Sequence, residues 1–176
     1  MQYMTQSELY RVMAIAKQEN KLHWQAMLAG FYFGLRVSEV INILGEDVQD
    51  GQVFVRRLKN SLTTLQPIPE TDTQSDFHLD LVELAKAAGP RGRVFPFSRQ
   101  RADQFMKRYC RLAGIHRTKA HFHAFKHSIA MVLWNRTQHP GQIKAYLGHK
   151  SMSSTMQYLN EVDSRKAQEV VASLNF

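Results

Sequence analysis

Apolar and polar residues alternate at helical spacing through the first part of the chain. The pattern Thr5-Gln-Ser-Glu8 forms a capping box, and the apolar stripe after it predicts a helix over residues 5–19. A second helix is predicted over about residues 23–33 and ends at Gly34, where glycine permits the chain to turn. The helical pattern then resumes over residues 37–44, so the chain opens as a set of helices.

Strand-forming residues and turn signals replace this pattern from residue 50. Asp50-Gly51 is typical of a tight turn, and residues 53–55 favour a strand. The segment 59–61 fits a hairpin tip, after which residues 63–68 return as a second strand. The sequence therefore predicts a small antiparallel sheet.

Helical periodicity returns for the rest of the chain, with glycines ending several of the helices. The most apolar of these helices covers about residues 123–136, so we expect it at the centre of the core. The predicted helices after the sheet span residues 77–88, 99–112, 123–136, 139–147, 153–159 and 162–174. The expected fold is mainly α with a small antiparallel β-sheet, an α+β class, in one domain over residues 1–176.

A surplus of basic residues narrows the classes of partner. The chain has 23 Lys and Arg against 15 Asp and Glu, a formal net charge of +8. This excess indicates a polyanionic partner, with nucleic acid ahead of an anionic membrane surface. No apolar run approaches the ~20 residues of a membrane helix. Cys110 is the only cysteine, which excludes a disulfide framework and favours a cytoplasmic location.

Candidate chemistry lies in separate segments that follow one another along the chain. Cleavage of a phosphodiester needs a nucleophile, a charge clamp on the phosphoryl oxygens and an acid for the leaving oxygen. Arginine can offer a planar fork to two phosphate oxygens, so protein cations can replace a metal and no cofactor is expected. The segments are Gly34-Leu35-Arg36-Val37-Ser38-Glu39, Lys59 at the hairpin tip, His123-Ala124-Phe125-Lys126-His127, Leu147-Gly148-His149, and Tyr158.

This ordered set resembles the signature of the tyrosine recombinase, or phage integrase, family over nearly the whole chain. The resemblance implies the catalytic-domain fold of that family and DNA recombination through a 3′-phosphotyrosyl bond at Tyr158. It implies that Lys59 protonates the leaving 5′ oxygen and that His123 assists proton transfer at the tyrosine. It also implies that Arg36 and His149 bind the phosphate. The expected partner is double-stranded DNA, held by a homotetramer on two duplexes, and the same residues serve integration, excision, inversion and resolution.

Lys126 departs from the family pattern, which has a second arginine at this position. A lysine keeps the positive charge but loses the fork, and it binds phosphate as a point charge. We therefore expect cleavage to be reduced but not abolished. The departure leaves open a weakened or inactive relative that only binds DNA.

The remaining basic and imidazole side chains receive less specific roles. His123 and His127 share a helical face, but the neighbourhood has no acid or thiolate to complete a site, so no metal is predicted. Glu39 is expected to orient Arg36. Contacts to the DNA backbone are expected from Arg56, Arg57, Lys144 and Lys150.

Other interpretations of the C-terminal part stay open. Residues 141–148 are also typical of a DNA-binding helix-turn-helix, and a type IB topoisomerase would share the chemistry. The apolar stripe of residues 162–174 fits docking on a neighbouring protomer as well as packing on its own domain. Family members usually carry an N-terminal DNA-binding domain, so a chain that begins near the catalytic domain is either a fragment or a short, single-domain member.

Overall fold

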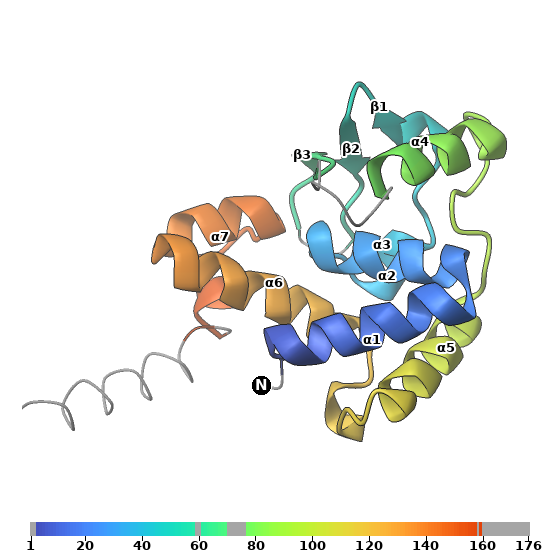
Figure 1. Ribbon diagram of the computed structural model, residues 1–176. Coiled ribbons are helices and arrows are strands. Elements are labelled where there is room, and N and C mark those ends of the chain that lie inside the picture. The colour runs from blue at the N-terminus through green and yellow to red at the C-terminus, as the bar shows by residue number, and fades with distance from the viewer. Residues whose placement is uncertain (1–2, 59–60, 70–76, 158, 160–176) are drawn as a thin grey trace, which may run out of the picture.

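Helices and a small sheet make up the fold that the sequence predicts (Figure 1). The computed structural model describes residues 3–58, 61–69, 77–157 and 159. Its elements are α1 (Gln6–Glu19), α2 (Lys21–Tyr32), α3 (Val37–Val40), η1 (Gly45–Asp47), β1 (Val48–Gln49), β2 (Gln52–Val55), β3 (Thr64–Pro67), α4 (Phe77–Ala88), α5 (Arg99–Leu112), η2 (Arg117–Lys119), α6 (Phe122–Thr137) and α7 (Pro140–Leu147).

The predicted capping box opens α1. The Thr5 hydroxyl accepts the backbone N–H of Glu8 at 3.2 Å, and the Glu8 carboxylate accepts the N–H of Thr5 at 2.7 Å. These bonds pair backbone donors that a helix start leaves without partners. Asn20 ends α1 and caps α2, since its Oδ1 accepts the backbone N–H of His23 at 2.9 Å.

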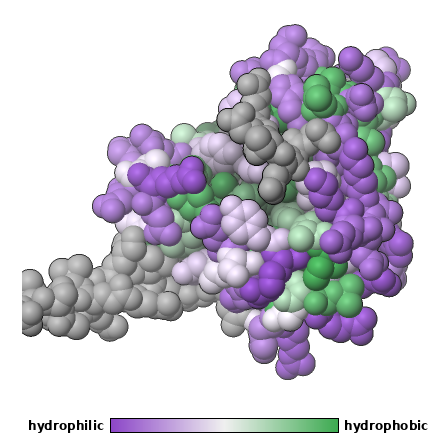
Figure 2. Space-filling view, in the orientation of Figure 1, coloured by the Kyte–Doolittle hydropathy of each residue, from purple (hydrophilic) through white to green (hydrophobic). Residues whose placement is uncertain are grey.

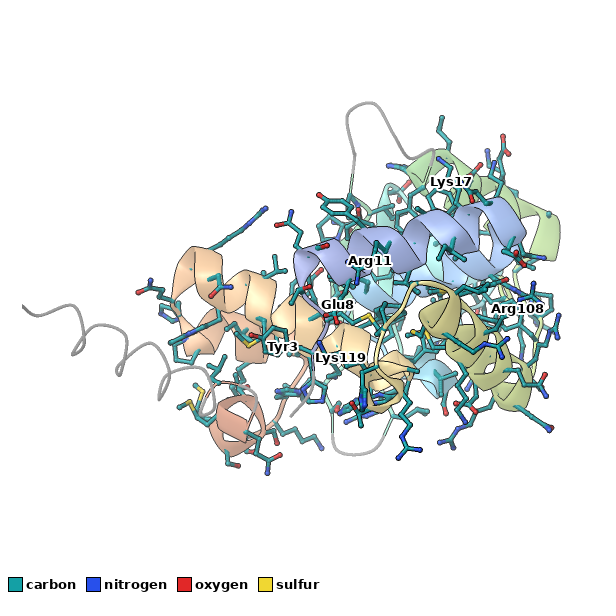
Figure 3. The ribbon with its side chains drawn as sticks, turned by 60° about the horizontal axis from the view of Figure 1, so that its bottom comes forward. Tyr3, Glu8, Arg11, Lys17, Arg108 and Lys119 are labelled. Carbon is teal, nitrogen blue, oxygen red and sulfur yellow. The ribbon has the colours of Figure 1, made fainter. Side chains whose placement is uncertain are left out.

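Polar contacts hold α1 against α5 and η2, and Figure 3 shows the side chains involved. Lys119 donates to both carboxylate oxygens of Glu8, at 2.9 and 2.8 Å. The Arg11 Nε donates to the carbonyl of Ala113 at 3.1 Å, and Arg108 pairs with the carboxylate of Glu19, at the end of α1. The helix packs on the core through Leu9, Val12 and Ala16.

The core lies where α2 crosses α6. Residues Trp24–Gly30 of α2 and most of the first half of α6 are buried. The two backbones approach closely at Gly30, where a Cβ would lie 3.0 Å from the Phe122 ring. The prediction that the helix over residues 123–136 is central is therefore confirmed.

The sheet has the order β1-β2-β3, and all pairs are antiparallel. The predicted turn joins β1 to β2, with left-handed φ angles of 50° at Asp50 and 71° at Gly51, as a two-residue hairpin loop requires. The strand β1 was not predicted. Residues 37–44 were predicted as one helix, but α3 ends at Val40. Ile43 and Leu44 instead pair with residues 93–94, and this tertiary pairing overrides the local helical pattern.

The C-terminal helices follow the predicted bounds closely. The bounds of α4 and α5 match the prediction. The helix α7 ends at Leu147, and Gly148 after it adopts a left-handed φ of 64°. Residues 152–157 are helical, and Leu159 is fully buried against α6 and α7. The predicted helix over residues 162–174 lies outside the described residues.

Polar residues cover most of the face seen in Figure 2, and apolar residues show only as separate patches. Within the described ranges, no helix combines the length and the apolar character needed to cross a bilayer.

Candidate active site

Arg36 lies where the end of α2 turns into α3. Gly34 adopts a left-handed φ of 58° that ends α2, and Arg36 is the N-cap of α3. The buried carboxylate of Glu39 accepts the backbone N–H of Arg36 at 2.8 Å and its Nη1 at 3.2 Å. Glu39 therefore orients the arginine, as the sequence indicates, while 38% of the Arg36 side chain stays exposed to a ligand.

A groove of about 1140 Å³ lies beside Arg36. Leu58 lines it from the segment after β2, Arg99 from the first turn of α5, and His121 and His123 from the start of α6. Basic and imidazole groups from separate helices thus meet around one hollow. Arg99 was not among the predicted site residues; its place at the start of an arginine-rich helix was the available signal.

His123 is half-buried in the first turn of α6. Its ring meets the His127 ring edge-on, with 4.4 Å between the centroids. Burial, and then the charges of Lys126 and Arg36, lower the pKa of His123 to about 4. Burial also lowers the pKa of His127 to about 3. Both rings are therefore neutral near pH 7, and a neutral imidazole can accept a proton.

Lys126 is buried in α6 with no exposed surface. Its Nζ lies 3.4 Å from the carbonyl oxygen of Leu147, at the end of α7. Burial, and then the charge of Arg57, lower the pKa of Lys126 to about 7, against the opposing effect of the Glu39 carboxylate. The lysine thus lies at the predicted site, but below its surface, and it can lose its proton near neutral pH.

His149 follows the left-handed turn that ends α7 and is 4% exposed. Its Nδ1 lies 3.0 Å from the hydroxyl of Thr155. Burial, and then the charges of Lys126 and Arg57, lower the pKa of His149 to about 4, with smaller effects from Arg36 and His123. The predicted site residues Arg36, His123 and Lys126 therefore lie close enough to His149 for their charges to affect its pKa.

Lys59 lies outside the described residues, but its described neighbours lie at this site. Leu58 lines the groove and donates its N–H to Glu39 at 3.2 Å. On the other side, Ser61 forms an antiparallel bridge with His149. The two ends of the hairpin segment are thus attached to the Arg36 and His149 regions.

Tyr158 also lies outside the described residues, and described residues flank it as well. Thr155 is fully buried and contacts His149. Leu159 packs into a cluster with Ile143 and Leu147 of α7. Described residues on both sides of position 158 therefore contact α7 or the residues directly after it.

The four residues expected at the DNA backbone have different environments. Arg57 is a correction: its side chain is fully buried and donates to backbone carbonyls, so it cannot reach a phosphate in this conformation. Arg56 is exposed but pairs with two carboxylates of η1, at 2.8 and 2.9 Å. Lys150 is exposed and Lys144 partly exposed, so both can still meet DNA.

Metal-binding residue types do not cluster in the described part of the chain, where no group of three or more His, Cys, Asp or Glu could hold an ion. His121 instead caps α6, since its Nδ1 accepts the backbone N–H of Ala124 at 3.1 Å. Cys110 is buried in α5, and burial raises its pKa to about 12. Cys110 therefore packs as a small apolar residue.

Known proteins match this chain over most of its length. Residues 2–165 match the phage integrase family. The type 1 fimbriae regulatory protein FimE of Escherichia coli K12 is 28% identical over 144 residues, covering 75% of this chain and 71% of FimE. Tyrosine recombinase XerA of Thermococcus kodakarensis is 29% identical over 175 residues, covering 94% of this chain but only 61% of XerA.

Solved structures share the fold. A crystal structure of XerA recombinase superimposes with a TM-score of 0.77 at 19% identity, covering 100% of this chain and 65% of that chain. A lambda integrase dimer bound to a COC′ core site has a TM-score of 0.70 at 17% identity, covering 89% of this chain and 47% of that chain. Lambda integrase residues 75–356 have also been solved bound to DNA.

The fold agrees with these relatives, and the family match covers every residue that is predicted to have a role in catalysis or DNA binding. The chain belongs to the phage integrase, or tyrosine recombinase, family.

Proposed function

We propose that this chain is the catalytic domain of a site-specific recombinase that cleaves and rejoins double-stranded DNA, with Tyr158 as the nucleophile. The observation that carries the proposal is that Arg36 and His123 line one groove, while Arg57 joins the segment before Arg36 to the segment before His149 through the carbonyls of Gly34 and Tyr146. Family membership supports it. The chain spans 61% of XerA, so the activity of a whole recombinase is part of the proposal.

The proposed reaction needs no redox step and no cofactor. The phenolic oxygen of Tyr158 attacks the phosphorus, a phosphotyrosyl bond forms, and the bond to the 5′ oxygen breaks. His123 takes the phenolic proton, and Lys59 gives a proton to the leaving 5′ oxygen. A 5′ hydroxyl from a partner duplex reverses these steps and joins the exchanged strands. Proton-transfer groups of this kind typically contribute about 10²–10⁴-fold in rate.

Arg36 and His149 stabilise the negative charge of the phosphate in this proposal. Arg36 is held by Glu39 with part of its guanidinium exposed, so it can donate to two phosphate oxygens. His149 is neutral near pH 7, and its Nδ1 can accept the Thr155 hydroxyl. The tautomer with a proton on Nε2 then donates to the phosphate.

Lys126 acts from below the groove in this proposal. Its burial makes it a source of charge rather than a ligand on the surface of the groove. A phosphate in the groove would raise its pKa, because a nearby negative charge favours the protonated amine. Binding of DNA would then charge the lysine when the reaction needs it.

The test uses a pool of nicked duplexes with a randomised core. Cleavage beside the nick releases a short oligonucleotide, so rejoining fails and a covalent adduct accumulates. We expect an SDS-resistant adduct whose modified peptide contains Tyr158. It should vanish in Tyr158→Phe and persist in Tyr10→Phe, which removes an exposed phenol on α1.

Binding and cleavage assays on the same protein distinguish the recombinase from the alternative functions. Wild-type protein that binds one core sequence without forming any adduct would overturn the enzyme and favour a DNA-binding relative or a helix-turn-helix regulator. Relaxation of supercoiled plasmid without a preferred sequence would favour a type IB topoisomerase. Sequencing of the trapped duplexes identifies the target site.

A further inference from the structure

Arg57 has an environment that neither DNA binding nor simple packing explains. Its side chain has no exposed surface. Its Nη1 donates to the carbonyl of Gly34 at 3.1 Å, and its Nη2 donates to the carbonyls of Phe33 and Tyr146, both at 3.0 Å. Its Nε lies 3.3 Å from the hydroxyl of Thr64. The whole guanidinium is therefore used inside the protein.

The carbonyls that Arg57 binds belong to the two segments that carry candidate phosphate ligands. Gly34 comes two residues before Arg36, and Tyr146 comes three residues before His149. Arg57 itself stands two residues before Lys59 in the chain. One side chain thus connects the end of α2, the end of α7 and the strand that leads into the hairpin.

Contacts around Gly148 show how closely these segments fit. A Cβ on Gly148 would lie 2.8 Å from the Arg57 Cδ and 2.9 Å from its Nε, and closer still to the carbonyl oxygen of Leu62. The N–H of Leu62 donates to the Gly148 carbonyl at 2.7 Å. The turn before His149 therefore packs directly on the Arg57 side chain and on Leu62, which precedes β3.

Only an arginine can make this set of bonds. Its N–H donors are spread over three nitrogens in one rigid plane, whereas a lysine has its donors on a single atom. Arg57 also brings a buried charge, with the Glu39 carboxylate 3.9 Å from its Nη1. That charge acts on both Lys126 and His149.

We propose that Arg57 is a positioning residue of the active site: it holds the Arg36 and His149 segments at a fixed separation and keeps positive charge beneath the groove. The proposal rests on the recombinase function proposed above. It predicts that the shape of the side chain sets the rate of the cleavage step. It also predicts that the charge of Arg57 adds to the effects of burial and of Lys126 in lowering the pKa of His149. Neither effect requires Arg57 to touch DNA.

The test compares Arg57→Lys, which keeps the charge, with Arg57→Gln, which removes it. Thr64→Val is a milder change, since it removes only the hydroxyl beside Nε. The control is Arg11→Lys, because Arg11 also donates to a backbone carbonyl but far from the site. Thermal unfolding first establishes that each variant is folded at the assay temperature.

Cleavage is measured as the rate of adduct formation at saturating protein, and DNA affinity is measured separately. We expect Arg57→Lys and Arg57→Gln to slow adduct formation by about 10²-fold, the size of effect that a small misplacement of catalytic groups can cause. Thr64→Val should slow it several-fold. DNA affinity and its salt slope should stay near wild type, and Arg11→Lys should match wild type throughout. A loss confined to affinity, with a salt slope lower by about 1, would instead mean a direct phosphate contact and overturn the proposal.

Nuclear magnetic resonance of the free protein gives a readout that needs no activity. The groups acting on His149 are Lys126, Arg57, Arg36 and His123. Loss of one positive neighbour should raise the pKa of His149 in Arg57→Gln, while Arg57→Lys leaves it unchanged. Arg57→Lys should nevertheless shift the amide signals of Gly148 and Leu58.

The outcomes distinguish this inference from the proposed function. If wild-type protein forms no adduct with any duplex, the proposed recombinase function is wrong. The amide shifts and the His149 titration then remain as the tests of whether Arg57 positions these segments. Unchanged amide signals in Arg57→Lys, or an unchanged His149 pKa in Arg57→Gln, would overturn the inference. An Arg57→Lys enzyme that cleaves at the wild-type rate would do the same.

Discussion

Replacing Lys126 by arginine restores the residue usual in the family, yet the structure predicts that it destabilises this protein. Lys126 has no exposed surface, and its Nζ lies 3.4 Å from the Leu147 carbonyl. Burial and the charge of Arg57 lower its pKa to about 7. A lysine in this position can become neutral, whereas an arginine stays charged at every pH that the fold survives.

The size of the effect follows from the two pKa values of the lysine. An unfolded lysine has a pKa near 10.4, and the folded one has a pKa of about 7. Between these values the unfolded chain binds the proton and the folded chain does not, so the stability of the wild type rises with pH. Each pH unit in this window changes the folding equilibrium by about tenfold, and the whole window amounts to roughly 5 kcal/mol.

Lys126→Arg loses this rise because arginine does not titrate there. The stability difference between wild type and variant should be smallest below about pH 7. Above that pH, the ratio of their folding equilibrium constants should grow by about tenfold per pH unit. The larger guanidinium adds a packing cost of about 1–3 kcal/mol that does not depend on pH. The sequence alone suggests that the lysine weakens cleavage, but its buried position reverses that expectation. Cleavage by Lys126→Arg should be slower than in wild type, which would mean that the site is built around lysine.

Urea unfolding of both proteins between about pH 6 and about pH 9 measures this difference, because other titrating groups contribute equally and cancel. Lys107→Arg is the control, since that side chain is 65% exposed and pairs with Asp103. It should show no dependence on pH. A constant difference between wild type and Lys126→Arg across this range would refute the reasoning.

Further predictions concern stability and DNA binding. Gly148→Ala should lower the free energy of urea unfolding clearly more than Gly114→Ala. Both glycines have a left-handed φ, which costs an alanine about 1–2 kcal/mol, but of these two only Gly148 has atoms in the way of a Cβ. Equal losses would contradict the close contact. Burial lowers the pKa values of His123, His127 and His149 to between about 3 and 4, so the unfolded chain binds protons before the folded protein does as the pH falls. The urea midpoint should therefore drop steeply below about pH 6.5. A flat midpoint down to about pH 4 would mean that these rings are not buried in the neutral form. Binding of the chain to random duplex DNA should weaken with salt, with a log–log slope near −0.9 for each neutralised phosphate, and binding that is insensitive to salt would argue against a role for the basic surface.

Local sequence signals predicted the elements well where local chemistry decides the structure. The capping box at Thr5, the turn at Asp50-Gly51 and the bounds of α4 and α5 all depend on neighbours in sequence. The prediction of one helix over residues 37–44 was wrong because Ile43 and Leu44 pair with a segment far along the chain. No local pattern contains that information.

The environment of Arg57 shows what the sequence could still have revealed. Exposure alternates along β2, from exposed Gln52 to buried Val55. Continued by two residues, this alternation puts Arg56 outside and Arg57 inside, as the structure has them. Their charge and their position close to Lys59 suggested that both arginines meet DNA. The period of the strand was therefore a better guide to Arg57 than its charge.

The interior position of Arg57 also gives a physical reason for a lysine at position 126. Arg36 lines the groove while Arg57 and Lys126 are buried beneath it, and the charges of both arginines act on Lys126. The Glu39 carboxylate opposes these positive charges. Two permanently charged guanidinium groups already share that carboxylate, and a third would add a cation that cannot lose its proton. A lysine with a pKa of about 7 can relieve this repulsion, because it can release its proton near neutral pH. It can regain the proton when the negative charge of a phosphate enters the groove. The departure from the family pattern at Lys126 and the buried arginine at Arg57 are therefore two parts of one electrostatic arrangement.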